Sequence, residues 1–273
     1  DKTENYKADL QFRSLKYAVF NISAETSQFE PLYDYRFGVE NENITIFSKN
    51  YGIDAVSLAV RYAYGEKIIK NLNFNYSTFS KAPIIWFKYT KGLTGIMNGA
   101  FEFNKFLFRL DQSFYFKYIG KTSFRVDAGI VNGNVPASLL FYNKASFRNF
   151  NINVPYSFST MRVNEFIADN FISIHFQHDF GKLIFGRGKF APSPVVLTSF
   201  GIGNLNNKNN HYDINIKTMG KGYWESGFMI NSLLVTGLYD LGVGAFYRYG
   251  AYKYSEFIDN LSIRLNVTFP FLN

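Results

Sequence analysis

Apolar and polar residues alternate strictly along many segments of the chain, including its last one. In "NLSIRLNVTFPFLN" one side carries large apolar residues, namely Leu261, Ile263, Leu265, Val267, Phe269 and Phe271. The other side carries Ser262, Arg264, Asn266, Thr268 and Pro270. A period of two is typical of a β-strand with one apolar and one polar face. The segment is therefore predicted to be a strand, and its role depends on what the apolar face contacts.

The same alternation recurs through the chain. Two such runs, residues 56–64 and 71–77, flank the sequence "EKIIK" and are predicted to pair as a hairpin. Further runs cover residues 106–118, 123–130, 172–179 and 241–249. The pattern predicts roughly ten to twelve strands, many of about the 9–11 residues that a tilted strand needs to cross a bilayer.

Two segments depart from this period. Residues 133–164 form a long, aromatic connection that is expected to fold onto the rest of the protein. Residues 201–211, "GIGNLNNKNNH", are predicted to be a mobile, solvated loop. Because the alternation resumes after both segments, residues 1–273 are interpreted as a single domain. The alternative is that they form the C-terminal part of a larger barrel or protein.

The polar sides of the strands favour a membrane barrel over the alternative, a soluble β-sandwich. They carry Ser, Gly, Asn and Ala with intermittent Arg, Asp and Glu, which suits a crowded barrel lumen. Tyr and Phe gather at strand ends, where an interfacial girdle would lie. The predicted fold is an all-β, transmembrane antiparallel β-barrel of the outer-membrane type, with residues 133–164 folded into the lumen. Lipid and lipopolysaccharide of the bacterial outer membrane are the expected surroundings.

Composition supports this interpretation. Aromatic residues make up 19% of the chain, with 31 Phe and 20 Tyr, while charged residues reach only 18%, below the roughly 25% of an ordinary soluble domain. The net charge of +8 comes from scattered Lys and Arg, which favours anionic headgroups over nucleic acid as the partner. No apolar run reaches the length of about 18 residues that a transmembrane helix needs. The first residues lack the apolar core of a signal peptide, so any export signal is expected to be removed or to lie upstream.

Candidate chemistry is sparse, and no catalytic, cofactor or metal site is predicted. Cysteine is absent, which excludes disulfides and thiolate ligands. His175 and His178 are three residues apart and point to opposite faces of a strand, so they cannot share a metal. His211 is expected to be solvated. Ser173 and His175 share a face, but no nucleophile elbow supports a lipid-modifying enzyme.

Several stretches together resemble a known family: "VSLAVRYAYGEKII", "APIIWFKYTKGL", "FSTMRVNEFIADNFISIHFQHDF", "GYWESGFMINSLL" and "GVGAFYRYG". They are similar to the C-terminal barrel of an uncharacterised Bacteroidota outer-membrane family whose full-length members carry a carboxypeptidase-regulatory-like N-terminal domain. That family is similar to the bacterial surface antigen barrels, which include the outer-membrane protein assembly factor. The resemblance covers about residues 50–273. It implies a sixteen-stranded barrel, a loop tucked into the lumen and a weak seam between the first and last strands.

The resemblance also implies a role and a set of site residues. The expected role is non-enzymatic, in outer-membrane or surface protein assembly or transport; a passive pore or a structural subunit of an envelope complex is the alternative. Other envelope proteins, or an N-terminal part of the same protein, are the expected partners. The chain departs from the family in being short for sixteen strands and in lacking the N-terminal domain. Phe269 and Phe271 resemble the C-terminal strand signal of outer-membrane barrels.

Related insertases carry an Arg-Gly-aromatic triplet in the inserted loop, whose Arg pairs with an acidic residue of the wall. The corresponding stretch here is Thr160, Met161 and Arg162, without the Gly, and it is followed by Glu165 and Asp169.

Charged residues on the predicted inward faces are the remaining candidates: Arg61, Arg109, Asp111, Arg125, Asp127, Glu225 and Arg248. Buried charges must be paired, so these residues are interpreted as a structural network or as contacts that hold the inserted loop. Arg162 or Arg148 is expected to pair with a wall carboxylate, and Glu225 is the first choice.

Overall fold

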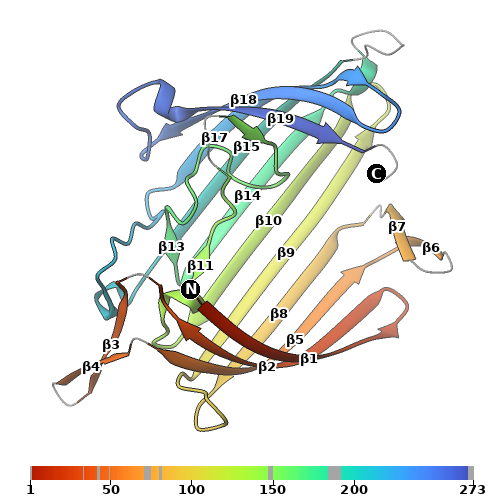
Figure 1. Ribbon diagram of the computed structural model, residues 1–273. Coiled ribbons are helices and arrows are strands. Elements are labelled where there is room, and N and C mark those ends of the chain that lie inside the picture. Colours follow the sequence, from red (N-terminus) through yellow and green to blue (C-terminus); the bar gives the residue numbers. More distant parts are fainter. Residues whose placement is uncertain are drawn as a thin grey trace.

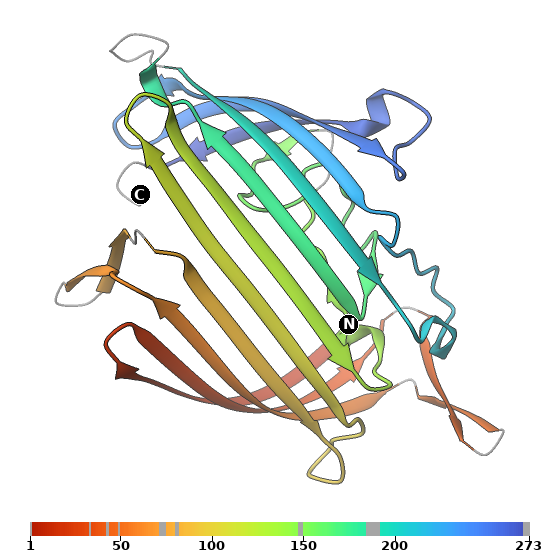
Figure 2. The same cartoon turned by 180° about the vertical axis from the view of Figure 1, so that it is seen from behind.

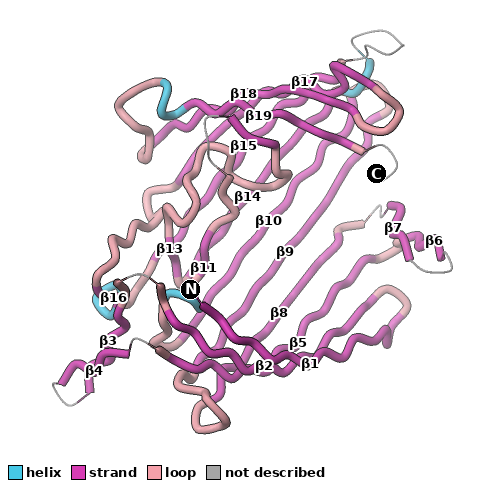
Figure 3. Tube along the Cα trace, viewed as in Figure 1, coloured by secondary structure: helices cyan, strands magenta, loops and turns pink. Residues whose placement is uncertain are grey.

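The computed structural model describes residues 2–32, 34–41, 44–48, 50–70, 75–79, 82–146, 150–183 and 192–269 of the 273-residue chain. Its regular structure is almost entirely β-strand, as Figure 3 shows. The helical elements in these ranges are single 3₁₀ turns at Ala137–Leu139, Gly181–Leu183, Lys208–Asn210 and Ile258–Asn260. Within the same ranges, no helix has the length and apolar character needed to span a membrane.

One sheet of twelve strands forms most of the molecule. Figures 1 and 2 show it strongly curved, with β1 at one end and β19, followed by the short β12, at the other. Its strands, in spatial order, are β1 (Lys2–Leu15), β2 (Ala18–Glu30), β5 (Tyr51–Ala63), β8 (Ile84–Leu93), β9 (Phe103–Phe116), β10 (Gly120–Asn132), β14 (Asn170–Asp179), β15 (Ser193–Asn204), β17 (Tyr223–Val235), β18 (Asp240–Gly250), β19 (Leu261–Thr268) and β12 (Phe150–Ile152). Neighbouring strands are antiparallel except β12, which is parallel to β19. The fold is all-β, as predicted, but over the described residues the two ends of the sheet are not joined to each other.

Three small sheets lie outside this large one. The first contains β3 (Arg36–Asn41), β4 (Ile44–Ser48) and β16 (His211–Tyr212). The second is a hairpin of β6 (Lys67–Lys70) and β7 (Asn75–Phe79). The third pairs β11 (Phe141–Tyr142) with β13 (Ile167–Ala168).

Three sequence-based expectations differ from this topology. The predicted hairpin between residues 56–64 and 71–77 is wrong, because β5 pairs with β2 and β8 while β6 and β7 pair with each other; residues 71–74 lie outside the described ranges. Alternation shows that a segment is a strand but does not reveal its partner. Residues 201–204 belong to β15 rather than to a loop. The sheet has twelve strands, not the sixteen that the resemblance implies.

The two faces of the sheet are reversed relative to a water-soluble protein. In β14, the side chains of Ile172, Ile174 and Phe176 are 39–45% exposed, whereas Ser173 and His175 are 3% and 5% exposed. In β19, Ile263 is 42% exposed while Arg264 is fully buried. The exposed convex face is therefore apolar, whereas the buried concave face carries polar side chains together with buried apolar ones such as Val195, Met229 and Phe246.

The segment between β10 and β14 lies against the concave face, as Figure 1 shows. The Lys105 ammonium of β9 donates to the carbonyl oxygen of Leu139 over 2.7 Å, and the Ser173 hydroxyl of β14 donates to Asn143 over 2.9 Å. The ring of Phe158 packs on His175 at a centroid distance of 4.9 Å. This segment, residues 133–169, is called the covering segment below.

Glycines make room for bulky side chains on the concave face. A Cβ added at Gly227 would lie 2.3 Å from the ring of Phe246, and one at Gly244 would lie 2.0 Å from Cγ of Met229. Each glycine therefore faces a large residue on the neighbouring strand.

His211 is buried, which corrects the expectation that it is solvated. Its side chain is packed between Tyr35 and Phe37, and only 8% of the residue is exposed. The Tyr35 hydroxyl and Nδ1 of His211 are hydrogen-bonded at 2.9 Å. Burial lowers the pKa of His211 to about 4, and the negative charge of Asp169 opposes this effect only in part.

We predict that the packing of β16 on β3 weakens in acid. A histidine with a depressed pKa in the folded state contributes stability above its unfolded pKa of about 6.5. That stability is lost as pH falls from there toward about 4, because the unfolded state then binds the extra proton. Hydrogen exchange of residues 205–217, corrected for intrinsic rates, should accelerate over this window, and His211→Gln should abolish the acceleration. An equal acceleration in His211→Gln would contradict the assignment.

Candidate functional site

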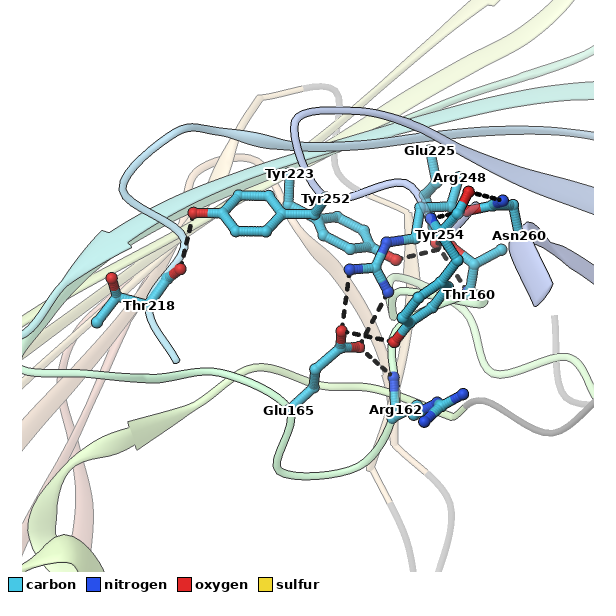
Figure 4. A network of polar contacts seen from close by, with 10 residues as sticks. All are labelled: Thr160, Arg162, Glu165, Thr218, Tyr223, Glu225, Arg248, Tyr252, Tyr254 and Asn260. Carbon is cyan, nitrogen blue, oxygen red and sulfur yellow. Dashed lines mark hydrogen bonds and ion pairs between the residues drawn. The ribbon is translucent and has the colours of Figure 1, made fainter. Parts of the chain in front are cut away.

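Three adjacent strands place charged side chains at one point of the concave face. Glu225 of β17, Arg248 of β18 and Arg264 of β19 are 1%, 2% and 0% exposed. Glu225 and Arg248 are direct partners in the β17–β18 register. The strand period turns them inward, while neighbours such as Trp224 and Ile263 point outward. Figure 4 shows Glu225 and Arg248 meeting the covering segment.

Glu225 binds the backbone of the covering segment. Its two carboxylate oxygens accept hydrogen bonds from the backbone N–H groups of Ser159 and Thr160, each over 2.8 Å. The Thr160 hydroxyl lies 2.6 Å from Oε2 of Glu225 and 2.7 Å from the Tyr223 hydroxyl. The guanidinium of Arg264 donates to the carbonyl oxygen of Ser159. The wall therefore holds this short stretch of backbone through both its N–H and its C=O groups.

Arg248 binds the covering segment through an ion pair with Glu165. Two hydrogen bonds of 2.9 and 3.2 Å join the guanidinium to the carboxylate, and both side chains are nearly inaccessible to solvent. The Tyr254 hydroxyl also donates to Glu165, over 2.9 Å. The rings of Tyr223 and Tyr254 lie 4.8 and 4.5 Å from the guanidinium carbon. These contacts compensate both buried charges, as an ion pair in a water-poor site requires.

The expected pairing of Arg162 with a wall carboxylate stays a prediction. The backbone N–H of Arg162 donates to Glu165 over 2.9 Å, and its guanidinium lies 5.0 Å from the ring centre of Tyr254. In the ion pair between Glu165 and Arg248, the covering segment supplies the acid and the wall supplies the arginine. Glu225 does contact the segment, as expected, but through backbone donors. Arg148, the second choice, lies outside the described residues.

Four of the predicted inward charges pair with each other. Arg109 binds Asp127 at 2.7 Å, and Arg125 binds Asp111 at 2.5 and 2.8 Å. Both pairs join residues that face each other directly across β9 and β10. The covering segment reaches this ladder through Tyr156, whose ring centre lies 4.1 Å from the guanidinium carbon of Arg125. The ladder therefore fits the interpretation as a structural network.

The remaining candidates lie apart from the Glu225 cluster. Asp169 accepts hydrogen bonds from the backbone of Asn206 over 2.7 Å and from the side chain of Asn170 over 2.6 Å, and so fixes the connection after β15. Arg61 binds Glu66 at the end of β5. Phe269 follows β19 and is 42% exposed. Phe271 lies outside the described residues.

Ser173 and His175 bind different partners. The Ser173 hydroxyl donates to Asn143, while Nδ1 of His175 is hydrogen-bonded to Ser199 at 2.9 Å. Over the described ranges, no three His, Cys, Asp or Glu side chains are grouped so that they could hold a metal ion.

Sequence reasoning missed Arg264 as a member of the site. The signal was present, because Arg264 is the one charged residue on the polar side of the last strand. Its target, the carbonyl of Ser159, left no trace in the sequence, because any residue type carries that group.

We predict that Arg248 and Glu165 are energetically coupled. Arg248→Met should cost about 3–5 kcal/mol, because it leaves a buried carboxylate without its partner. Adding Glu165→Gln should recover part of the loss, so that the double variant is more stable than the two single effects imply. Urea unfolding measures these values. As a control, Lys91→Met, which breaks a pair with the exposed Glu102, should cost about 1 kcal/mol or less. Additive single effects would contradict the coupling.

Comparison with known protein families gives a match over most of the chain. A family model described as "Family of unknown function (DUF5686) C-terminal domain" matches residues 15–212. No curated protein is similar to the chain. The matched range runs from the end of β1 to β16 and includes Thr160 and Glu165, whereas Glu225, Arg248 and Arg264 follow it. It agrees with the expected resemblance to an uncharacterised family, and it covers well over half of the chain. The chain therefore belongs to the family of unknown function DUF5686, of which it contains the C-terminal domain.

Proposed function

We propose that this chain forms the wall of a β-barrel in the bacterial outer membrane, with a non-enzymatic role in the assembly or transport of outer-membrane or surface polypeptides. The observation that carries the membrane assignment is the exposed apolar convex face. Phe114, Phe228 and Val243 on this face are 41–49% exposed. Contact of such a face with water would cost about 25 cal/mol for each Å², whereas lipid removes that cost. Lipid and lipopolysaccharide are accordingly the proposed surroundings.

Aromatic residues at the strand ends support the same proposal. Tyr115 and Tyr118, at the β9–β10 turn, are 76% and 77% exposed, and Tyr64 follows the end of β5. Tyr and Trp are enriched where a membrane meets water, because their rings are amphipathic. The net charge of +8 suits the anionic phosphates of a headgroup layer.

The role in handling polypeptides is supported by the way the covering segment is held. Glu225, Arg248 and Arg264 come from three consecutive strands near one end of the sheet, and all three bind this segment. Apolar packing of Phe158, Met161 and Phe166 against Met219 and Tyr223 adds to these polar contacts. Loss of the buried polar contacts is expected to loosen the segment as a unit. In a barrel it would act as a plug whose release opens the interior.

A passive pore is the second candidate. A cavity of about 390 Å³ lies beside the charge ladder and is lined by Arg61, Trp86, Lys88, Arg109 and Asp127, among others. Charged linings of this kind tune the selectivity of barrel channels. The hydrogen bonds that Ser173 and His175 make elsewhere favour either role over a lipid-modifying enzyme.

Glu225→Gln tests the plug and separates the two roles. A glutamine presents an N–H₂ group where the carboxylate accepts from both Ser159 and Thr160, so one donor loses its acceptor. We expect the plug to loosen. Single-channel conductance should rise, and reconstituted insertion of a client barrel should fall. Glu102→Gln, at an exposed position, is the matched control.

Unchanged conductance and insertion in Glu225→Gln would contradict the role of the covering segment as a plug. Raised conductance, together with wild-type protein that inserts no client, would favour the passive pore.

A further inference from the structure

Within the part of the chain that the structure describes, the two ends of the large sheet have no strand neighbours along most of their length. Over the described residues, β1 pairs only with β2, and all 14 of its residues are exposed. At the other end, β12 covers three of the eight residues of β19. Figures 1 and 2 show these edges facing the same opening.

Open edges conflict with a membrane position. Backbone N–H and C=O groups have no water to bind in the hydrocarbon layer, so a membrane sheet must pair both of its edges. This argument rests on the proposed function, because in water such an edge would be tolerated.

The strand count determines which closures are possible. Leaving out β12, eleven strands are joined by ten antiparallel contacts. The first and the eleventh strand therefore run in the same direction, and β12 runs parallel to β19. Direct pairing of β1 with β19 or with β12 would be parallel. An antiparallel closure needs an odd number of additional strands between the two edges.

The order of the strands indicates where these additional strands come from. From β1 to β19, the strands follow one another across the large sheet in the same order as along the chain. The neighbour that continues this order beyond β1 is the polypeptide directly before Lys2. We propose that an odd number of antiparallel strands, formed by the polypeptide that directly precedes residue 2, joins β1 to β19 and closes the barrel.

The side chains at the two edges also predict the pattern of apolar and polar residues in the additional strands. In β1, Tyr6, Leu10 and Phe12 pair with residues of the apolar convex face, and polar residues such as Lys7 and Gln11 alternate with them. The incoming strand beside β1 needs the same alternation. The additional strand beside β19 pairs along Leu261–Thr268 and takes the place of β12. Because β12 contacts only three residues of β19, its pairing is weaker than that of a strand along the full length of β19.

Cysteine cross-linking in native outer membranes tests the closure, because the chain has no cysteine of its own. Ala8→Cys with Ala24→Cys is the positive control, since these residues face each other across β1 and β2. Ala8→Cys combined in turn with Leu261→Cys, Ile263→Cys or Leu265→Cys reports direct closure of β1 on β19. Ala8→Cys alone reports pairing with a second copy. The proposal expects a cross-link in the control alone.

Hydrogen exchange and intact mass complete the test. In protein purified from native membranes, all backbone amides of β1 should be protected, and the mass should exceed the 31.5 kDa of this chain. In the isolated chain of residues 1–273, alternate amides of β1 should exchange rapidly.

A cross-link from β1 to β19, a cross-linked dimer, or rapid exchange of alternate β1 amides in the native protein would each overturn the proposal. Extraction of the same membranes with alkaline carbonate shows separately whether the protein is membrane-integrated, so failure of the closure is distinguishable from failure of the membrane assignment.

Discussion

The structure depends on one constraint, which is that the alternation along the strands puts apolar side chains on the exposed convex face and gathers charged and polar side chains on the buried concave face. Ile174 and His175 show it within two residues, because the first is exposed and the second is buried. A polar interior must satisfy its hydrogen bonds internally. The ladder of Arg109, Asp127, Arg125 and Asp111 and the binding of the covering segment are both consequences of this requirement.

The covering segment and the wall compensate each other. Without the segment, Glu225, Arg248 and Arg264 would lose partners that satisfy part of their hydrogen-bonding capacity. Without the wall, the N–H groups of Ser159 and Thr160 would lose the acceptors that they have in a buried site. Because a buried group without a partner costs more than a typical hydrogen bond contributes, the two parts are expected to bind and separate together. This cooperativity is what makes a plug physically reasonable.

Much of the fold was predictable from the sequence, because a period of two depends only on backbone geometry. The strand character of the runs and the inward direction of Glu225 and Arg248 follow from it. The packing of residues 133–164 on the sheet was predictable for another reason, which is the length and aromatic content of that connection. The partners did not follow. The sequence suggested that Arg162 would be the loop's charged contact, whereas Glu165 makes the ion pair with Arg248. The binding of Glu225 to backbone N–H groups was hidden as well, because such groups occur at every residue except proline.

The central claim is that the convex face contacts lipid and the concave face does not. The chain contains two tryptophans, and they lie on opposite faces. Trp224 is 40% exposed beside Phe200 on the convex face, whereas Trp86 lies between the guanidinium groups of Arg61 and Arg109 on the concave face. Quenching of tryptophan fluorescence by lipids with brominated acyl chains, measured on the single-tryptophan variants Trp86→Phe and Trp224→Phe, therefore tests the claim directly. The account predicts strong quenching of Trp224 and little of Trp86. Equal quenching of both, or quenching of Trp86 alone, would contradict it.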